Sequence, residues 1–209
     1  MKIAVLVSGS GTNLQTLINN LHQDSTSSIA IAVVISDRSK VFALTRAKRA
    51  GIPIHIVSAQ EYDNRVDFDA EISRLLDHYA IDLIVLAGFM KLFQPPFVQK
   101  YRNRIINVHP SLLPAFPGAN AVPDTLAYGV KVTGVTVHFV DEEMDTGPII
   151  AQRTVPVYDT DDEKSLHQRI QIEEHKLYPE VIRWYAQGTL SVNGRQVINM
   201  HTCNKTSMS

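Results

Sequence analysis

The amino-acid sequence predicts an α/β fold with a mainly parallel central sheet and helices on both of its faces, in a Rossmann-like arrangement. Short, largely β-branched apolar runs alternate with segments whose apolar residues recur at helical spacing, which is the pattern of a βαβα chain. The 209 residues, of which 44% are hydrophobic and 20% charged, suffice for one good core but not comfortably for two. We therefore expect a single domain over residues 1–209.

Predicted strands and helices alternate along the first half of the chain. Four apolar runs of strand length are separated by two to three helical turns' worth of sequence: residues 3–7, 29–35, 53–57 and 83–87. Between these runs, apolar residues recur at helical spacing in three groups: Leu14, Leu17, Ile18 and Leu21; Val41, Leu44 and Ala47; Ile72, Leu75, Leu76 and Tyr79. These segments are predicted to cover a parallel sheet.

The second half continues the pattern with longer elements. We expect three strands at residues 104–108, 132–140 and 149–157, and then a helix over 161–186. Asn193-Gly194, between two extended pieces in residues 190–198, is a strong two-residue hairpin signal. A break near residue 100 would separate two halves of one sheet, and residues 199–209 are expected to be a flexible tail.

Composition excludes several classes of function. The net charge of −1, with charged residues scattered along the chain, provides no basic stripe, so nucleic acid is not expected as a partner. The single cysteine, Cys203, can close no intramolecular disulfide, which suits a reducing compartment and makes the cytoplasm the default location. The longest apolar run, residues 81–90, contains Asp82 and is too short to span a membrane, and no signal peptide is evident.

A small, polar loop, Ser-Gly-Ser-Gly-Thr-Asn at residues 8–13, lies between the first strand and the first helix. Small residues let the backbone approach a ligand, and a helix N-terminus offers free N–H donors. The loop is not a nucleotide P-loop, because no lysine follows its second glycine, and Leu14 occupies the third glycine position of the dinucleotide fingerprint. Three interpretations stay open: a phosphomonoester site, a dinucleotide site in which Asp37 binds a ribose, and a tight structural turn.

A polar pair ends the apolar strand at residues 104–108. Side chains two apart on a strand point to the same face, so Asn107 and His109 should project together, and Pro110 ends the strand. An amide donor beside an imidazole at the carboxyl edge of a sheet suits an oxyanion and acid/base pair. A single histidine at such a position is more often held by local hydrogen bonds, so His109 alone would be structural.

An acidic loop, residues 141–148, joins two of the predicted strands. Most of its acids read as a solvated turn, shaped by Gly147 and Pro148. Asp145 differs only if the loop folds back over His109, where a carboxylate would favour and orient an imidazolium. No histidine spacing in the chain suggests a metal site.

Five segments together, in this order, resemble the glycinamide ribonucleotide formyltransferases, the folate-dependent enzymes of purine synthesis. The resemblance runs from Lys2 to about Gly188 and is specific because all five segments are in register. They are SGSGTNLQ at the first loop, VLAGFMKLF at 85–93, NVHPSLLPAFPG at 107–118, VHFVDEEMDTGPII at 137–150 and EEHKLYP at 173–179.

The resemblance implies a role for each matching residue. A phosphate-binding half over about residues 1–100 would precede a catalytic and folate half over about 101–190. The substrate's phosphate and ribose would be held by Gly11, Thr12, Asn13 and Glu174. Folate would be bound by Arg65, Met90, Lys91, Leu92, Phe93 and Asn107. His109 would donate a proton, and Asp145 would raise its pKa. Residues 119–123 depart from the family, which commonly carries further histidines there, but this departure removes none of the three residues proposed for the chemistry.

The implied reaction transfers the formyl group of 10-formyltetrahydrofolate, a co-substrate, to glycinamide ribonucleotide without a metal. Both substrates are small molecules, no membrane or nucleic acid takes part, and the chain would be a monomer or a homodimer. A formyltetrahydrofolate hydrolase resembles the catalytic half but normally adds an N-terminal regulatory domain. Methionyl-tRNA formyltransferase adds a C-terminal RNA-binding domain, for which this chain lacks the length and the basic charge. A nucleotide or folate sensor would not need Asn107, His109 and Asp145 together, and Leu14 disfavours an NAD-dependent oxidoreductase.

Overall fold

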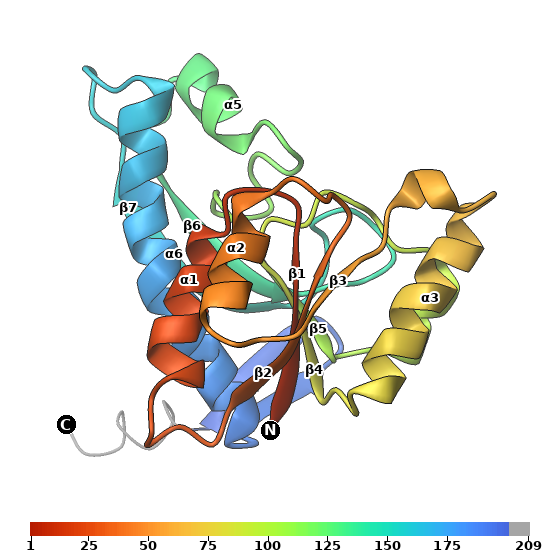
Figure 1. Ribbon diagram of the computed structural model, residues 1–209. Helices are drawn as coiled ribbons and strands as arrows, with labels where there is room; N and C mark the ends of the chain where they lie inside the picture. Colours follow the sequence, from red (N-terminus) through yellow and green to blue (C-terminus); the bar gives the residue numbers. More distant parts are fainter. Residues whose placement is uncertain (201–209) are drawn as a thin grey trace. The chain divides into compact units, whose positions relative to one another are not determined.

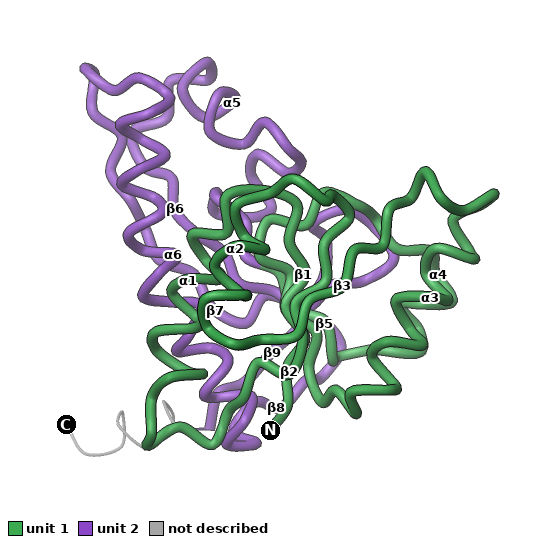
Figure 2. Tube along the Cα trace, in the orientation of Figure 1, with its two compact units in different colours: residues 1–107 green, residues 108–209 purple. Residues whose placement is uncertain are grey.

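The computed structural model describes residues 1–200, and its strands form a seven-stranded sheet in the order β3-β2-β1-β4-β5-β6-β7 and a separate pair, β8-β9 (Figure 1). The predicted α/β class with a mainly parallel sheet is thereby confirmed. Cys203 and the predicted tail beyond residue 200 lie outside the described residues. Contacts divide the chain into two compact units, Met1–Asn107 and Val108–Ser209 (Figure 2). That these units form one domain stays a prediction.

Parallel pairing organises the strands of the first unit. β1 (Lys2–Val7) pairs with β2 (Ala30–Ser36) on one side and with β4 (Leu83–Leu86) on the other. β3 (Ile54–Ile56) pairs with β2, and β5 (Ile105–His109) pairs with β4. Because these strands are parallel, the loops that follow them leave from one edge of the sheet, where open α/β folds bind ligands.

Helices cover both faces of these strands. α1 (Thr12–Leu17), continued by a π-helical turn at Ile18–His22, and α2 (Phe42–Arg49) lie on one side, and α3 (Arg65–His78) lies on the other (Figure 1). A 3-10 turn at Ala59–Glu61 precedes α3, whose first turn is capped because the Asn64 side chain accepts a hydrogen bond from the Asp67 N–H at 3.0 Å. A short helix, α4 (Pro95–Lys100), follows the β4 loop.

The second unit is built on an antiparallel strand pair and one long helix. β6 (Val132–Phe139) pairs with β7 (Ile149–Pro156), and α6 (Glu163–Ala186) packs against both. The core of the second unit includes Val122, Val155, Leu166 and Ile170. Because Val122 belongs to α5 (Ala121–Tyr128), this helix also packs against α6 and β7. The hairpin predicted around Asn193-Gly194 is confirmed as β8 (Leu190–Asn193) and β9 (Gln196–Asn199).

Two of the helices were not predicted from the sequence. α4 begins with Pro95-Pro96, and α5 carries Pro123 in its first turn. A proline fits the first turn of a helix, because the N–H groups there have no helical partner, but in a sequence it reads as a break. No helix within residues 1–200 is long and apolar enough to cross a membrane.

Candidate active site

Ser8 connects two loops of the first unit that the sequence assigned to different ligands. Its N–H donates to the Gly88 carbonyl at 3.1 Å, and its hydroxyl accepts a hydrogen bond from the Met90 N–H at 2.9 Å. These bonds tie the glycine loop after β1 to the segment after β4. The loop predicted to bind phosphate and the segment predicted to bind folate, residues 90–93, are therefore neighbours at the carboxyl ends of two paired strands.

The segment after β4 exposes part of its apolar surface. Met90 and Leu92 are 62% and 55% exposed, whereas Phe93 is buried and stacks on Phe97 with ring centroids 4.1 Å apart. Arg65 donates to the Leu92 carbonyl at 2.7 Å, so it lies beside this segment as the resemblance implies. Lys91 is half-buried between the two exposed residues. Exposed apolar side chains held by a fixed backbone suit a flat aromatic ligand, while the Phe93 ring belongs to the core.

Asp69, on α3, is a polar residue of this region that sequence reasoning missed. It is 4% exposed, and its Oδ2 accepts a hydrogen bond from the Gln94 N–H at 2.7 Å, which fixes the end of the segment after β4. Burial raises the pKa of Asp69, and the Gln94 N–H and Arg65 oppose that effect. A signal was present in the sequence, since Asp69 follows Arg65 by one helical turn and sits beside Phe68 on a face that is otherwise buried.

The glycine loop adopts a conformation that a side chain would prevent. Gly11, the residue before α1, has φ 73°, in the left-handed region that favours glycine. A Cβ added there would lie 2.6 Å from the Ala43 Cβ on α2, so the loop packs directly on that helix. Thr12 and Asn13 follow as the first residues of α1. The loop is thus a close backbone turn, as both the phosphate interpretation and the interpretation as a tight structural turn require.

His109 ends β5, and its imidazole is enclosed by acceptor atoms of the second unit. Nε2 lies 2.8 Å from the Phe116 carbonyl oxygen, and Nδ1 lies 3.4 Å from Asp145 Oδ2. Ser111 helps to fix the same turn, because its hydroxyl donates to the Ala115 carbonyl at 2.5 Å. Both ring nitrogens face atoms that only accept hydrogen bonds, an arrangement that only the imidazolium satisfies fully.

The acidic loop does fold back over His109, as a role for Asp145 demands. Asp145 has φ 57°, and its Oδ2 also accepts a hydrogen bond from the Gly118 N–H at 2.8 Å. Gly147 makes the return possible, because a Cβ there would lie 1.9 Å from the Phe139 carbonyl oxygen. The carboxylate is therefore held between the turn at Gly118 and the end of β6.

Burial and neighbouring groups have opposite effects on the pKa of His109. Burial lowers it below 6.5, and the hydrogen bond with Phe116 and the charge of Asp145 oppose the shift without reversing it. Asp145 thus acts as predicted, but desolvation of the imidazole outweighs it. Asp145 shifts the pKa of His109 in the direction that the resemblance implies, but sequence patterns did not reveal the burial of the ring, which is only 5% exposed.

Asp145 is ionised at neutral pH. Burial raises the pKa of its carboxyl, but hydrogen bonding with His138 and with the Gly118 N–H, together with His109, lowers it below 3.8 overall. His138, on β6, lies with Nε2 3.7 Å from Asp145 Oδ1, and its Nδ1 lies 2.8 Å from the Phe139 carbonyl. No role was predicted for His138, because its position in an alternating strand is typical of a core residue.

The other residues named by the resemblance have definite places. Asn107 lies on β5 two residues before His109, where strand geometry turns both side chains to one face, and it is half-buried. Glu174 lies on α6 and is 5% exposed. Within residues 1–200, no group of three or more His, Cys, Asp or Glu side chains is arranged to hold a metal ion.

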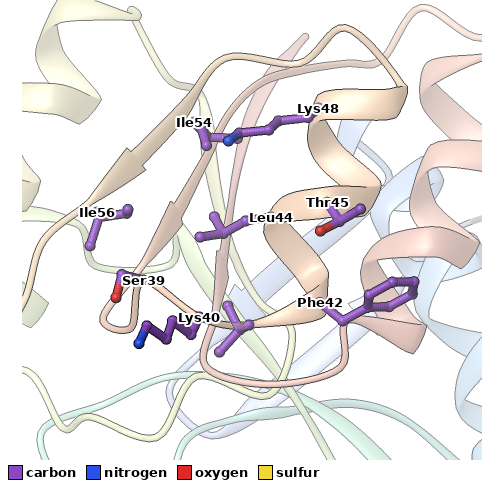
Figure 3. A pocket seen from close by; sticks show the side chains of 9 residues that line it. Ser39, Lys40, Phe42, Leu44, Thr45, Lys48, Ile54 and Ile56 are labelled. Atoms are coloured by element: carbon purple, nitrogen blue, oxygen red, sulfur yellow. The ribbon is translucent and has the colours of Figure 1, made fainter.

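A cleft of about 410 Å³ lies elsewhere in the first unit, between α2 and β3 (Figure 3). Leu44 and Lys48 point into it from α2, and Ile54 and Ile56 line it from β3. None of the residues that the sequence assigned to a site lines this cleft. The cleft therefore lies on the side of α2 that faces away from the glycine loop.

The chain has an α/β fold with a mainly parallel sheet, a glycine loop after the first strand and a buried His109–Asp145 pair. These features define the class of protein to which the chain belongs. Residues 1–182 match the model of the formyl transferase family, and the chain belongs to that family. Phosphoribosylglycinamide formyltransferase of Escherichia coli is 42% identical over 193 residues, which cover 92% of this chain and 91% of that protein. A crystal structure of glycinamide ribonucleotide transformylase 1 from Symbiobacterium toebii is 46% identical, with a TM-score of 0.93 over 96% of this chain and 94% of that one.

Some relatives are much longer. The trifunctional purine biosynthetic protein adenosine-3 of Homo sapiens is 45% identical over 196 residues, 93% of this chain. This chain spans only 19% of that protein's length.

Proposed function

We propose that this chain transfers the formyl group of 10-formyltetrahydrofolate to the amine of glycinamide ribonucleotide, giving formylglycinamide ribonucleotide and tetrahydrofolate. The observation that carries the proposal is the His109–Asp145 contact of 3.4 Å, made by a loop that returns over the end of β5. It supplies a buried acid with an orienting carboxylate, which acyl transfer needs and a binding protein does not. Family membership and the named relatives support the choice of substrates.

In the proposed reaction the neutral amine attacks the formyl carbon, and the carbonyl electron pair moves onto oxygen to form a tetrahedral oxyanion. The Asn107 amide and the protonated His109 stabilise that oxygen. The C–N bond to the folate then breaks as the folate nitrogen takes a proton, and the proton lost by the attacking amine balances it. Asp145 favours the charged form of His109 and orders a water for this proton transfer.

Substrate placement follows the predicted sites. The ribonucleotide phosphate would lie on Gly11, Thr12 and Asn13 with its ribose at Glu174, and the pteridine would lie against the segment after β4. Asp69 and Arg65 would help by fixing that segment, through Gln94 and Leu92. No metal takes part in the proposed steps. The cytoplasmic location and the choice between monomer and homodimer stay predictions from the sequence.

A formyl-transfer assay with 10-formyl-5,8-dideazafolate, run with and without glycinamide ribonucleotide, tests the proposal. We expect release of deformylated folate that depends on the ribonucleotide and is lost in His109→Ala. Asn107→Ala should lose roughly a hundred- to a thousandfold in turnover, the usual effect of removing one oxyanion donor. His167→Ala, at an exposed position on α6, is the matched control and should keep full activity.

The other outcomes are equally informative. Release without the ribonucleotide would show that water is the acceptor and would replace the transferase by a hydrolase. Absence of release with either acceptor would favour a sensor. Full turnover in Asn107→Ala would refute the oxyanion assignment.

A further inference from the structure

Helix α2 holds the glycine loop at successive peptide groups. The Ala43 N–H donates to the Gly9 carbonyl at 3.2 Å, and Arg46 Nε donates to the Ser10 carbonyl at 3.0 Å. The close packing of Gly11 on Ala43 continues the contact by one more residue. Three consecutive loop residues are thus attached to one face of the helix.

These two hydrogen bonds determine which way the loop's donors point. In a trans peptide, the carbonyl of one residue and the N–H of the next point in opposite directions. Since the Gly9 and Ser10 carbonyls point at α2, the N–H groups of Ser10 and Gly11 point away from it. Neither N–H donates to an acceptor within residues 1–200. The two adjacent N–H groups are therefore directed to the side of the loop opposite α2, the arrangement that an anion-binding loop requires.

Arg46 is itself held in a single place. Its Nη1 donates to Gln15 Oε1 at 3.1 Å, and its guanidinium lies 4.7 Å from the centre of the Phe42 ring. Gln15 Nε2 in turn donates to Asn19 Oδ1 at 2.9 Å, which extends the chain of contacts along the first helix. A planar guanidinium with several directed donors can make these contacts together, and a lysine ammonium cannot reproduce them.

The charge of Arg46 is not neutralised by a neighbouring acid. Within residues 1–200, no carboxylate lies at ion-pair distance from it. A half-buried cation whose donors are used on neutral carbonyl and amide oxygens leaves a net positive charge beside the loop. Such a charge favours an anion at the free N–H groups nearby.

We propose that Arg46 is a positioning residue for the phosphate of the ribonucleotide: it fixes the Ser10 peptide so that the loop's N–H groups face the ligand, and it adds an unneutralised positive charge beside them. The inference rests on the proposed function, because it takes that phosphate to be the ligand of the loop. Arg46 acts through the loop backbone and is not required to touch the reacting atoms.

Three variants separate geometry from charge. Arg46→Met keeps the apolar stem but loses both the hydrogen bonds and the charge, and Arg46→Lys restores only the charge. Lys48→Met removes a positive charge from the same helix at a side chain that points into the cleft on the opposite side (Figure 3). Lys48→Met is therefore the matched control.

The first measurement is amide hydrogen exchange in the protein without ligands, followed at Ala43 and Gln15. Their N–H groups donate to the loop carbonyls of Gly9 and Gly11, so they report whether the loop stays in place. We expect both amides to exchange at least about tenfold faster in Arg46→Met and in Arg46→Lys, and to be unchanged in Lys48→Met. Unchanged exchange in Arg46→Met would overturn the positioning role, whatever reaction the protein performs.

The second measurement is the steady-state formyl-transfer kinetics. We expect the KM for glycinamide ribonucleotide to rise about 10- to 100-fold in Arg46→Met, the usual effect of losing hydrogen bonds from a charged group, with a smaller rise in Arg46→Lys. The KM for the folate and kcat should stay within about threefold. A KM for the ribonucleotide equal to that of Lys48→Met would overturn the inference. Absence of ribonucleotide-dependent transfer in the unmodified protein would instead overturn the proposed function, and the exchange result would still decide the role of Arg46.

Discussion

Two imidazoles share one carboxylate at the centre of the candidate site. Asp145 lies 3.4 Å from Nδ1 of His109 and 3.7 Å from Nε2 of His138, and the other nitrogen of each ring faces a backbone carbonyl. At His109, burial disfavours the charged ring, whereas the hydrogen bond with Phe116 and the charge of Asp145 favour it. Because the charge on Asp145 opposes the effect of burial, its removal would make His109 harder to protonate.

Asp145→Asn tests this balance. Asparagine tolerates the left-handed backbone at this position and can still accept the Gly118 N–H, so the substitution removes mainly the charge. Without that charge the pKa of His109 falls further, and less of the acid is protonated at any given pH. We expect turnover at neutral pH to fall about a hundredfold or more, within the usual range for general acid–base catalysis. The descending, alkaline limb of the kcat profile should move to lower pH, so acidification should restore part of the activity.

The pH profile separates this role from a purely structural one. A misfolded or distorted loop would reduce kcat by the same factor at every pH, and a shift of the alkaline limb would not occur. Wild-type turnover and an unmoved alkaline limb in Asp145→Asn would remove Asp145 from the mechanism. Thermal unfolding of both proteins in the same buffers controls for lost stability.

The sequence identified some of these residues on physical grounds and others only through the resemblance. Asn107 and His109 follow from strand alternation, because their spacing fixes a shared face. Asp145 could be named but not placed, since its contact depends on a loop that must turn back through Gly147. His138 and Asp69 were missed because a polar residue in a regular element looks like any other until its burial is known.

At the scale of elements, long and regularly patterned segments were predicted well. The helix expected over residues 161–186 is α6, and the strand expected over 149–157 is β7, each within about two residues. α5 was missed because Asn120 just before it and Pro123 in its first turn are typical of loops, and only packing on the core around Leu166 reveals the helix. Short helices of this kind depend on tertiary contacts that the local sequence does not contain.

The start of α6 provides a test at this scale. Asp162 accepts a hydrogen bond from the Ser165 N–H at 2.7 Å, and Ser165 Oγ accepts one from the Asp162 N–H at 3.0 Å, so the two residues form a capping box. Asp162→Ala should lower the free energy of unfolding, because the Ser165 N–H loses its acceptor. Asp162→Asn, which retains a capping oxygen, should cost much less. Urea denaturation measures both, and equal values for the two variants would contradict the capping role.

At the scale of the whole molecule, the rhythm of strands and helices predicted the fold class but not the order of the strands. The order β3-β2-β1-β4 places the first strand inside the sheet, and it depends on crossovers that no local pattern determines. The sequence predicted a break between two halves of the sheet near residue 100. In the structure, the boundary between the two compact units follows Asn107, inside β5.

That strand leads to a prediction about cooperativity. Since β5 runs without interruption from one unit into the next, and the chain is short for two independent cores, we expect one unfolding transition. Gly134 on β6 tests this expectation. An added Cβ would lie 2.1 Å from the Arg153 carbonyl oxygen, so Gly134→Ala should lower the free energy of unfolding by about 3 kcal/mol or more.

Two signals follow the unfolding of this variant. Trp184, the only tryptophan, reports on the second unit, and circular dichroism reports on the whole chain. Both midpoints should fall together in Gly134→Ala and stay nearly unchanged in Val132→Ala, at an exposed position of the same strand. The contrary result in Gly134→Ala would be a lower denaturation midpoint for Trp184 fluorescence, with part of the circular-dichroism change still occurring at the midpoint of the unmodified protein. That result would show that the two units unfold separately.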